Sequence, residues 1–272
     1  MSKAASILVR ITLLSRLQLF FPLFIFFSTH IAHAQQAPLI VPETVYLVAH
    51  EFEYGSLAGD GDEQPVVRVQ LDSFYIGRYE ITVAQYAQFA QDTGRALPAD
   101  NSIENPEYPI VNVTFEDAKT YARWLSRKTG DKWRLPNEYE WEMAAGLGVH
   151  KEYVNNIQAS ELCKFANIAD ESAADDMPNI TPCSDGSQGI TAVGSYAPNN
   201  ASLYDMHGNV WEWTSNCYRD TNGAYKPFSC DAYTVRGGSF MTPAVHVRVT
   251  NREQLDKNNR LAQVGFRLVK ER

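Results

Sequence analysis

A long central segment, residues 146–230, has neither the hydrophobic period of a helix nor that of a strand. It is rich instead in Asp, Asn, Ser, Gly and Pro, which are typical of turns and loops. A segment without an amphipathic face buries little apolar surface when it folds. Covalent or metal cross-links are therefore the main way to stabilise such a segment. The sequence therefore favours regular elements that flank a long, cross-linked loop region.

Residues 1–34 have the features of a signal peptide. A basic start precedes an apolar core at residues 17–27, and small residues at Ala32 and Ala34 suit cleavage. The alternative, an uncleaved anchor helix, needs about 20 apolar residues, and Pro22 interrupts this core. We predict a periplasmic or secreted protein with a signal peptide over 1–34, a polar lead over 35–43 and one domain over 44–272.

The charge balance excludes two classes of partner. Removing residues 1–34 takes away three Lys and Arg and no acid, which leaves 21 Lys and Arg against 32 Asp and Glu, a net charge of −11. Nucleic acids and anionic membrane surfaces bind basic patches. We therefore expect no nucleic-acid partner and no binding to anionic membrane surfaces. No segment after residue 34 is apolar enough to span a bilayer, so after signal cleavage we also expect no stable membrane span.

The four cysteines are candidates for the cross-links. Four cysteines allow three pairings, and the pairs Cys163–Cys183 and Cys217–Cys230 each close a short loop rich in turn residues. A redox-active or copper-binding thiol pair is the alternative. Because an exported chain with an even number of cysteines favours disulfides, we predict two structural bridges.

Regular elements are predicted on both sides of the central segment. Thr114 is a candidate helix cap, Gly94 and Gly146 are candidate helix stops, and Pro136 suits a helix start. The predicted strands cover residues 45–52, 66–74, 233–235, 245–249 and 265–269, and the predicted helices cover residues 81–94, 114–128 and 136–146. No internal repeat divides the chain, so a single α+β domain is the simplest organisation.

Two oxygen-rich stretches carry the clearest chemistry, since glycine-rich phosphate loops, Gly-x-Ser-x-Gly and His-Glu-x-x-His are absent. The first stretch holds Asn167, Asp170, Asp175, Asp176 and Asp185. In the second, Asp205 and Glu212 flank a glycine turn. Calcium takes six to eight oxygen ligands, which such turns supply, although a solvated acidic loop would have the same composition.

A series of motifs connects these stretches to a known family. The motifs are, in order over residues 79–269, YEITVAQYAQFAQDTG, RLPNEYEWEMAAG, LYDMHGNVWEWTSNCY, RGGSF and GFRLV. The chain resembles the sulfatase-modifying-factor, or formylglycine-generating-enzyme, family. The resemblance implies a single compact α+β domain, distantly related to C-type lectins, with few helices, short strands and long loops.

The resemblance also implies two structural calcium sites. The family's ligand motifs place the first site on Asn167, Ile168, Asp185 and Ser187, through side chains and backbone carbonyls. They place the second on Asp205, Gly208, Val210 and Glu212. Calcium would then hold loops that lack an apolar face.

The sequence departs from the family at the reaction centre. The family's oxidases hold Cu(I) between two cysteines just after the Gly-Gly-Ser turn and convert a substrate cysteine to formylglycine. Thr242 stands at the first of these positions, and no cysteine follows Asp231. Copper is therefore not expected, because Cu(I) prefers thiolates. Relatives without these cysteines include inactive paralogues and a periplasmic factor that oxidises a pyoverdine precursor.

Other side chains could serve this pocket. The pocket candidates are Thr242, His246, Arg248 and Arg252. His50, His207 and His246 could gather around iron or copper, or be ordinary turn and surface histidines. Arg248, Arg252 and Arg267 could bind an anionic or peptide substrate, or pair with the surplus of acids. Glu140 and Glu212 are possible general bases, but we assign Glu140 to the helix framework and Glu212 to calcium.

Two functions follow from the resemblance. The first is a maturation factor that acts on a peptide or peptide-derived substrate by a route without copper. The alternative is a non-catalytic, calcium-stabilised, lectin-like module that binds a protein, peptide or glycan.

Overall fold

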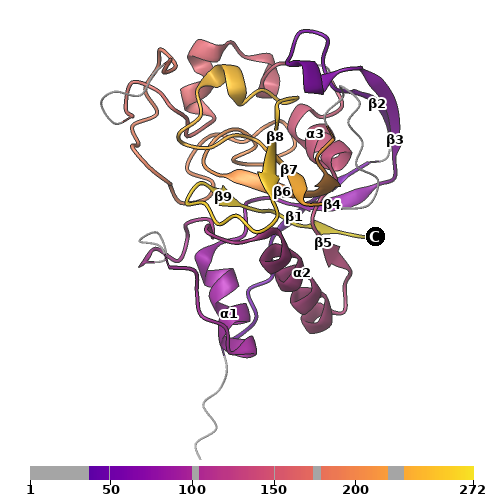
Figure 1. Cartoon of the computed structure of the whole chain (residues 1–272), viewed down its shortest axis with the longest axis vertical. Coiled ribbons are helices and arrows are strands. Elements are labelled where there is room, and N and C mark those ends of the chain that lie inside the picture. Colours follow the sequence, from indigo (N-terminus) through magenta and orange to yellow (C-terminus); the bar gives the residue numbers. More distant parts are fainter. Residues whose placement is uncertain (1–36, 49, 100–103, 150, 174–178, 220–229) are drawn as a thin grey trace, which may run out of the picture. The chain divides into compact units, whose positions relative to one another are not determined.

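Two helices pack against each other through aromatic side chains (Figure 1). They are α1 (Val83–Thr93) and α2 (Phe115–Thr129), close to the predicted bounds. Thr82 and Thr114 cap their amino-terminal ends, and Gly94 and Gly130 end them in the left-handed conformation. The aromatic residues between the helices and the core are Tyr86, Phe89, Tyr121, Trp124 and Phe266.

The computed structural model describes residues 37–48, 50–99, 104–149, 151–173, 179–219 and 230–272. The predicted signal peptide lies outside the described residues, as do Asp175 and Asp176. Among the described helices, none has the length and hydropathy needed to cross a membrane.

The third helix, α3 (Glu138–Gly146), forms close to the predicted bounds, but the prediction of Gly146 as its stop was wrong, because Gly146 is still helical and Leu147 takes the left-handed conformation that ends it. Asn137 caps it, because its side chain accepts a hydrogen bond from the Glu140 N–H while the Glu140 carboxylate accepts one from the Asn137 N–H. Glu140 also binds Arg134 through both oxygens. These contacts give Glu140 the framework role expected from the sequence.

Each of the first two predicted strands is divided in two. The outer halves, β1 (Thr44–Leu47) and β4 (Phe74–Gly77), pair with each other. They belong to a sheet of order β1-β4-β10-β5, in which β10 is the carboxyl-terminal strand Val269–Lys270 and β5 is Trp133–Arg134. The inner halves, β2 (His50–Tyr54) and β3 (Val67–Leu71), form a separate two-stranded ribbon. The prediction of two unbroken strands was therefore wrong, because the outer halves join a different sheet from the inner ones.

A second four-stranded sheet, of order β8-β7-β6-β9, lies at the centre of Figure 1. Its strands are β6 (Trp211–Cys217), β7 (Ala232–Arg236), β8 (Arg252–Asp256) and β9 (Val264–Gly265). The sheet of β1 and β4 is completed by β5 (Trp133–Arg134) and β10 (Val269–Lys270). The predicted strand at 265–269 is thus two short strands in different sheets.

The predicted strand at residues 245–249 is wrong. A 3-10 turn, Ala244–His246, takes its place. Its apolar alternation is real, since Val247 and Val249 are buried while Val245 is exposed. Pro243 starts the turn, and the Val247 N–H binds the Ala244 carbonyl instead of a neighbouring strand.

Residues 39–272 form one compact α+β unit with few helices, short strands and long loops, as predicted. The described part of residues 147–210 contains only two 3-10 turns, Val154–Asn156 and Ala159–Lys164. A buried cluster around Leu162, Ala166 and Ile168 includes Cys163. The disulfide that Cys163 forms thus lies where regular structure is missing.

Both predicted disulfides are present, Cys163–Cys183 and Cys217–Cys230. The second joins the end of β6 to the segment that precedes β7. No cysteine of the chain is free, so no thiol pair is left to bind copper.

We expect the purified mature protein to show no free thiol when it is titrated in denaturant without reductant. After reduction, four thiols should react, because the chain has four cysteines in two bridges. A titre near two or above before reduction would contradict this pairing.

Candidate functional site

The first predicted ligand set comes together in the structure. The Asp185 carboxylate accepts hydrogen bonds from the N–H groups of Ile168 and Ser187, each at 2.8 Å. The Asn167 side chain donates through Nδ2 to the Gly189 carbonyl at 2.8 Å, so the other end of its amide is the oxygen Oδ1. That end, Oδ1 of Asn167, is buried and has no hydrogen-bond partner. Burial also raises the pKa of Asp185 to about 6.

The second predicted set lies around a fully buried ion pair. Arg267 donates to both oxygens of Glu212, at 2.6–2.9 Å, and the indole N–H of Trp141 donates to the same carboxylate. Asp205 accepts a hydrogen bond from the Gly194 N–H through Oδ2, while its Oδ1 is buried without a partner. Burial raises the pKa of Asp205 to about 6.

Sequence reasoning missed Glu80, which completes this second cluster. Its carboxylate accepts hydrogen bonds from the Asn209 side chain at 2.8 Å and from the Val210 N–H at 3.2 Å. Burial raises the pKa of Glu80 well above its usual range, and the neighbouring Asp205 raises it further. In the sequence, the only sign of Glu80 was its place directly before Ile81, the first residue of the predicted helix over 81–94.

The buried charges of the second cluster do not balance. Three carboxylates, Glu80, Asp205 and Glu212, share one guanidinium, that of Arg267, which leaves a formal charge of −2 when all are ionised. Buried charges are costly unless they are paired or coordinate a metal. Asp205 Oδ1 is an oxygen of the kind that calcium prefers and has no other partner. The free Oδ1 of Asp205 and the surplus negative charge are therefore compatible with a divalent cation beside Asp205.

Gly208 joins the two sets. The Gly208 backbone forms a bridge with Asn167, and the Asn209 N–H donates to the Asn167 carbonyl at 2.8 Å. A Cβ on Gly208 would lie 1.9 Å from that carbonyl oxygen, and its φ of +72° also favours glycine. No other residue would allow the two loops this approach.

The Gly-Gly-Ser turn is formed, and Thr242 is part of its hydrogen bonding. The Ser239 N–H donates to Thr242 Oγ1 at 3.1 Å, and the two hydroxyl oxygens are also 3.1 Å apart. The Thr242 carbonyl accepts from the Ala169 N–H. Thr242 thus supports the turn with its hydroxyl.

The three candidate histidines do not form a metal site. His207 is fully buried, with Nδ1 bonded to the Val247 carbonyl and Nε2 accepting from the Val154 N–H. Burial lowers its pKa to about 4. His50 binds the Val48 carbonyl, and His246 is exposed. Within the described residues, the only three His, Cys, Asp or Glu side chains whose ligand atoms all lie within 4.8 Å of one another are Asp170 and the disulfide-bonded Cys163 and Cys183.

The candidate arginines are paired with acids. Arg248 binds Glu63 and Asp60, and its side chain is only 10% exposed. Arg252 binds Glu138 through both carboxylate oxygens, each at 2.9 Å. The structure thus gives both Arg248 and Arg252 acidic partners within the protein, as the pairing alternative expects.

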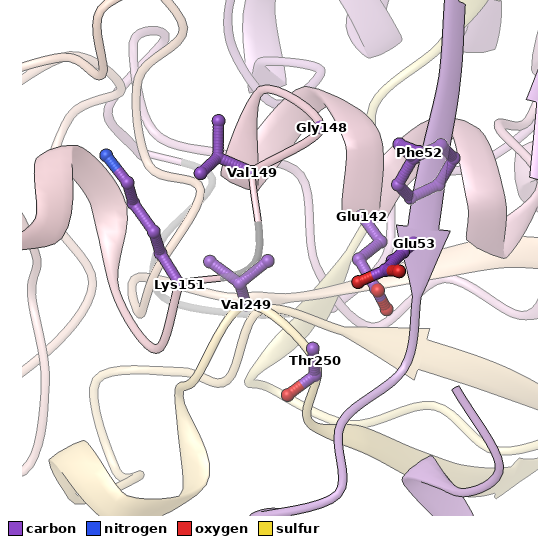
Figure 2. A pocket seen from close by; sticks show the side chains of 8 residues that line it. All are labelled: Phe52, Glu53, Glu142, Gly148, Val149, Lys151, Val249 and Thr250. Carbon is purple, nitrogen blue, oxygen red and sulfur yellow. The ribbon is translucent and has the colours of Figure 1, made fainter. Parts of the chain in front are cut away.

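A small cavity lies beside Glu142 and Thr250 (Figure 2). Its volume is about 10 Å³, room for a single water molecule. Glu142 is paired with the fully buried Arg236 and accepts a hydrogen bond from the Gly55 N–H, while burial raises its pKa to about 7. This cavity is too small for a substrate.

The sequence and the fold are similar to those of known proteins. Residues 30–272 match the sulfatase-modifying factor enzyme 1-like domain. The formylglycine-generating enzyme of Streptomyces coelicolor is 26% identical, over 87% of this chain and 93% of that protein. The inactive Cα-formylglycine-generating enzyme 2 of the mouse is 31% identical, over 63% of this chain and 52% of that protein. The structure of PvdO from Pseudomonas aeruginosa superposes with a TM-score of 0.73 at 30% identity, over 85% of this chain and 95% of that one.

Replacing Arg248 with Met should destabilise the fold by about 3–5 kcal/mol, because it leaves the buried Glu63 carboxylate without its charge partner. Urea unfolding measures this change. Arg68→Met is the matched control, since Arg68 is 72% exposed and pairs only with surface acids, a contact worth about 1 kcal/mol or less. Equal effects of the two substitutions would contradict a structural role for Arg248.

Proposed function

Because this chain belongs to the sulfatase-modifying-factor, or formylglycine-generating-enzyme, family, we propose that it is an exported maturation factor. It acts on a peptide or peptide-derived substrate by a route that does not use the family's copper dithiolate. The observation that carries the proposal is the Gly-Gly-Ser turn, which keeps the family's frame while Thr242 replaces the thiol and every cysteine is in a disulfide. The two disulfides support export to an oxidising compartment, the periplasm or the exterior.

An exposed apolar rim beside the turn supports a peptide-like substrate. Met241 is 49% exposed and Val245 is 51% exposed. Ile180, 40% exposed, is held next to them because the Thr181 hydroxyl accepts a hydrogen bond from the Ala244 N–H at 2.8 Å. Apolar side chains gathered on the surface are typical of sites that bind other molecules.

We also propose that two calcium ions stabilise the loops, one in each predicted ligand set. The orphaned Oδ1 atoms of Asn167 and Asp205 support this assignment, as does the surplus negative charge around Glu212. Calcium would supply positive charge and oxygen coordination there, without taking part in the reaction. Arg267 already neutralises Glu212, so Asp205 is the carboxylate that most needs the ion.

Chelation should lower the melting temperature of the protein, and added calcium should restore it, because the ion binds the folded state. Asp205→Asn should bind calcium more weakly and lose most of this response, whereas the exposed Asp72→Asn should behave as the wild type. Metal analysis and thermal unfolding measure both effects. A protein that is free of calcium and equally stable in chelator would contradict the assignment.

The purified protein should make no formylglycine from a Cys-x-Pro-x-Arg peptide under air, even with copper, because it lacks the thiolate pair. Mass spectrometry of the peptide is the measurement. Formylglycine as product would contradict the role given to Thr242.

The maturation role itself is tested by comparing peptides and peptide-derived metabolites of a deletion strain with those of the parent. We expect an unmodified precursor to accumulate, and the purified protein to change its mass. Met241→Glu/Val245→Glu should slow this conversion at least tenfold, whereas Val48→Glu, at a site 65% exposed in the amino-terminal part, should not. Retention of such a compound without any change of mass would instead indicate the lectin-like binding module.

A further inference from the structure

A larger cavity lies between the β2–β3 ribbon, the start of α3 and the end of β6. Its volume is about 490 Å³, within the range of about 300–1,000 Å³ that is usual for small-molecule sites. No residue of the Gly-Gly-Ser turn and neither predicted calcium set lines it. A function of this cavity would therefore be separate from the maturation proposed above.

The floor of the cavity is an ion pair that is already saturated. Arg252 donates to both oxygens of Glu138 and to the carbonyls of Asp62 and Arg219. Glu138 also accepts hydrogen bonds from the hydroxyls of Tyr54 and Thr234, each at 2.8 Å. Because both charges are neutralised within the protein, the floor is fixed in position and gives a charged ligand no unpaired partner.

The walls combine aromatic surface with unused polar groups. Tyr54 and Tyr139 meet edge to face, with ring centres 4.7 Å apart. Within the described chain, the hydroxyls of Tyr139 and Ser215 make no hydrogen bond. The Asn216 Oδ1 accepts from the Glu138 N–H at 2.8 Å, which fixes the amide and leaves its Nδ2 donor available at the cavity. Hydroxyls can donate and accept, whereas the amide nitrogen only donates.

We infer that this cavity binds a neutral sugar, such as the end of a glycan. The C–H faces of a sugar ring match an aromatic wall, and its hydroxyls match neutral donors and acceptors such as Tyr139, Ser215 and Asn216. A peptide is a poorer match, because it relies on free backbone groups of a strand edge, and side chains supply the polar contacts here. The inference does not depend on the chemistry at Thr242.

The test is binding of neutral hexoses, N-acetylhexosamines and their disaccharides to the mature protein, measured by saturation-transfer NMR and calorimetry. At least one sugar should bind. Tyr139→Phe removes only a hydroxyl and should weaken binding about three- to tenfold. Ser215→Trp fills the cavity from an exposed position and should abolish binding. Tyr46→Phe, a matched control on β1 away from the lining residues, should keep the wild-type affinity.

Thermal unfolding checks that each variant is folded before its binding is compared. The inference is overturned if no sugar of the panel binds, if binding is unchanged in Ser215→Trp, or if an acetylated, amidated tripeptide displaces the sugar at lower concentration. Met241→Glu/Val245→Glu should leave sugar binding intact. This variant distinguishes a failure at the cavity from a failure of the maturation proposal.

Discussion

The contact between Glu212 and Arg267 holds the centre of the molecule together, since both side chains are at most 1% exposed. Glu212 comes from β6, Arg267 lies between β9 and β10, and Trp141 of α3 donates to the same carboxylate at 2.8 Å. Arg267 also binds the carbonyls of Gly77 and Tyr204, so one guanidinium joins both sheets to the loop region. Losing one partner of such a pair leaves a buried charge and costs about 3–5 kcal/mol.

The helices were predictable because their signals are local. Thr114 and Gly94 act at the ends of amphipathic segments, and the structure uses both as expected. The strands were less predictable, because pairing over long distances decides where they break. The segment 245–249 alternates like a strand, yet it has no strand to pair with and turns at Pro243. The division of the first two strands similarly depends on β10, almost two hundred residues further along the chain.

The sequence indicated where oxygen-bearing side chains gather, but it did not indicate which charges pair with each other. The resemblance located Asn167 and Asp205, whose Oδ1 atoms are buried without a hydrogen-bond partner. Glu80 was missed because a single acid beside an apolar residue gives no periodic signal. Arg248 and Arg252 could equally have faced a substrate, since sequence does not show which acids lie opposite. Only the folded chain shows that these arginines are occupied and that one carboxylate cluster keeps a negative surplus.

The most direct test of whether calcium ions bind at these two sites is anomalous X-ray diffraction from crystals grown with calcium. Two anomalous peaks are expected, each about 2.3–2.6 Å from a predicted oxygen ligand. One should lie next to Asn167 Oδ1 and the other next to Asp205 Oδ1, the two buried oxygens without a hydrogen-bond partner. Well-ordered density at both positions without an anomalous signal, as water would give, would contradict the proposal that cations hold these loops together.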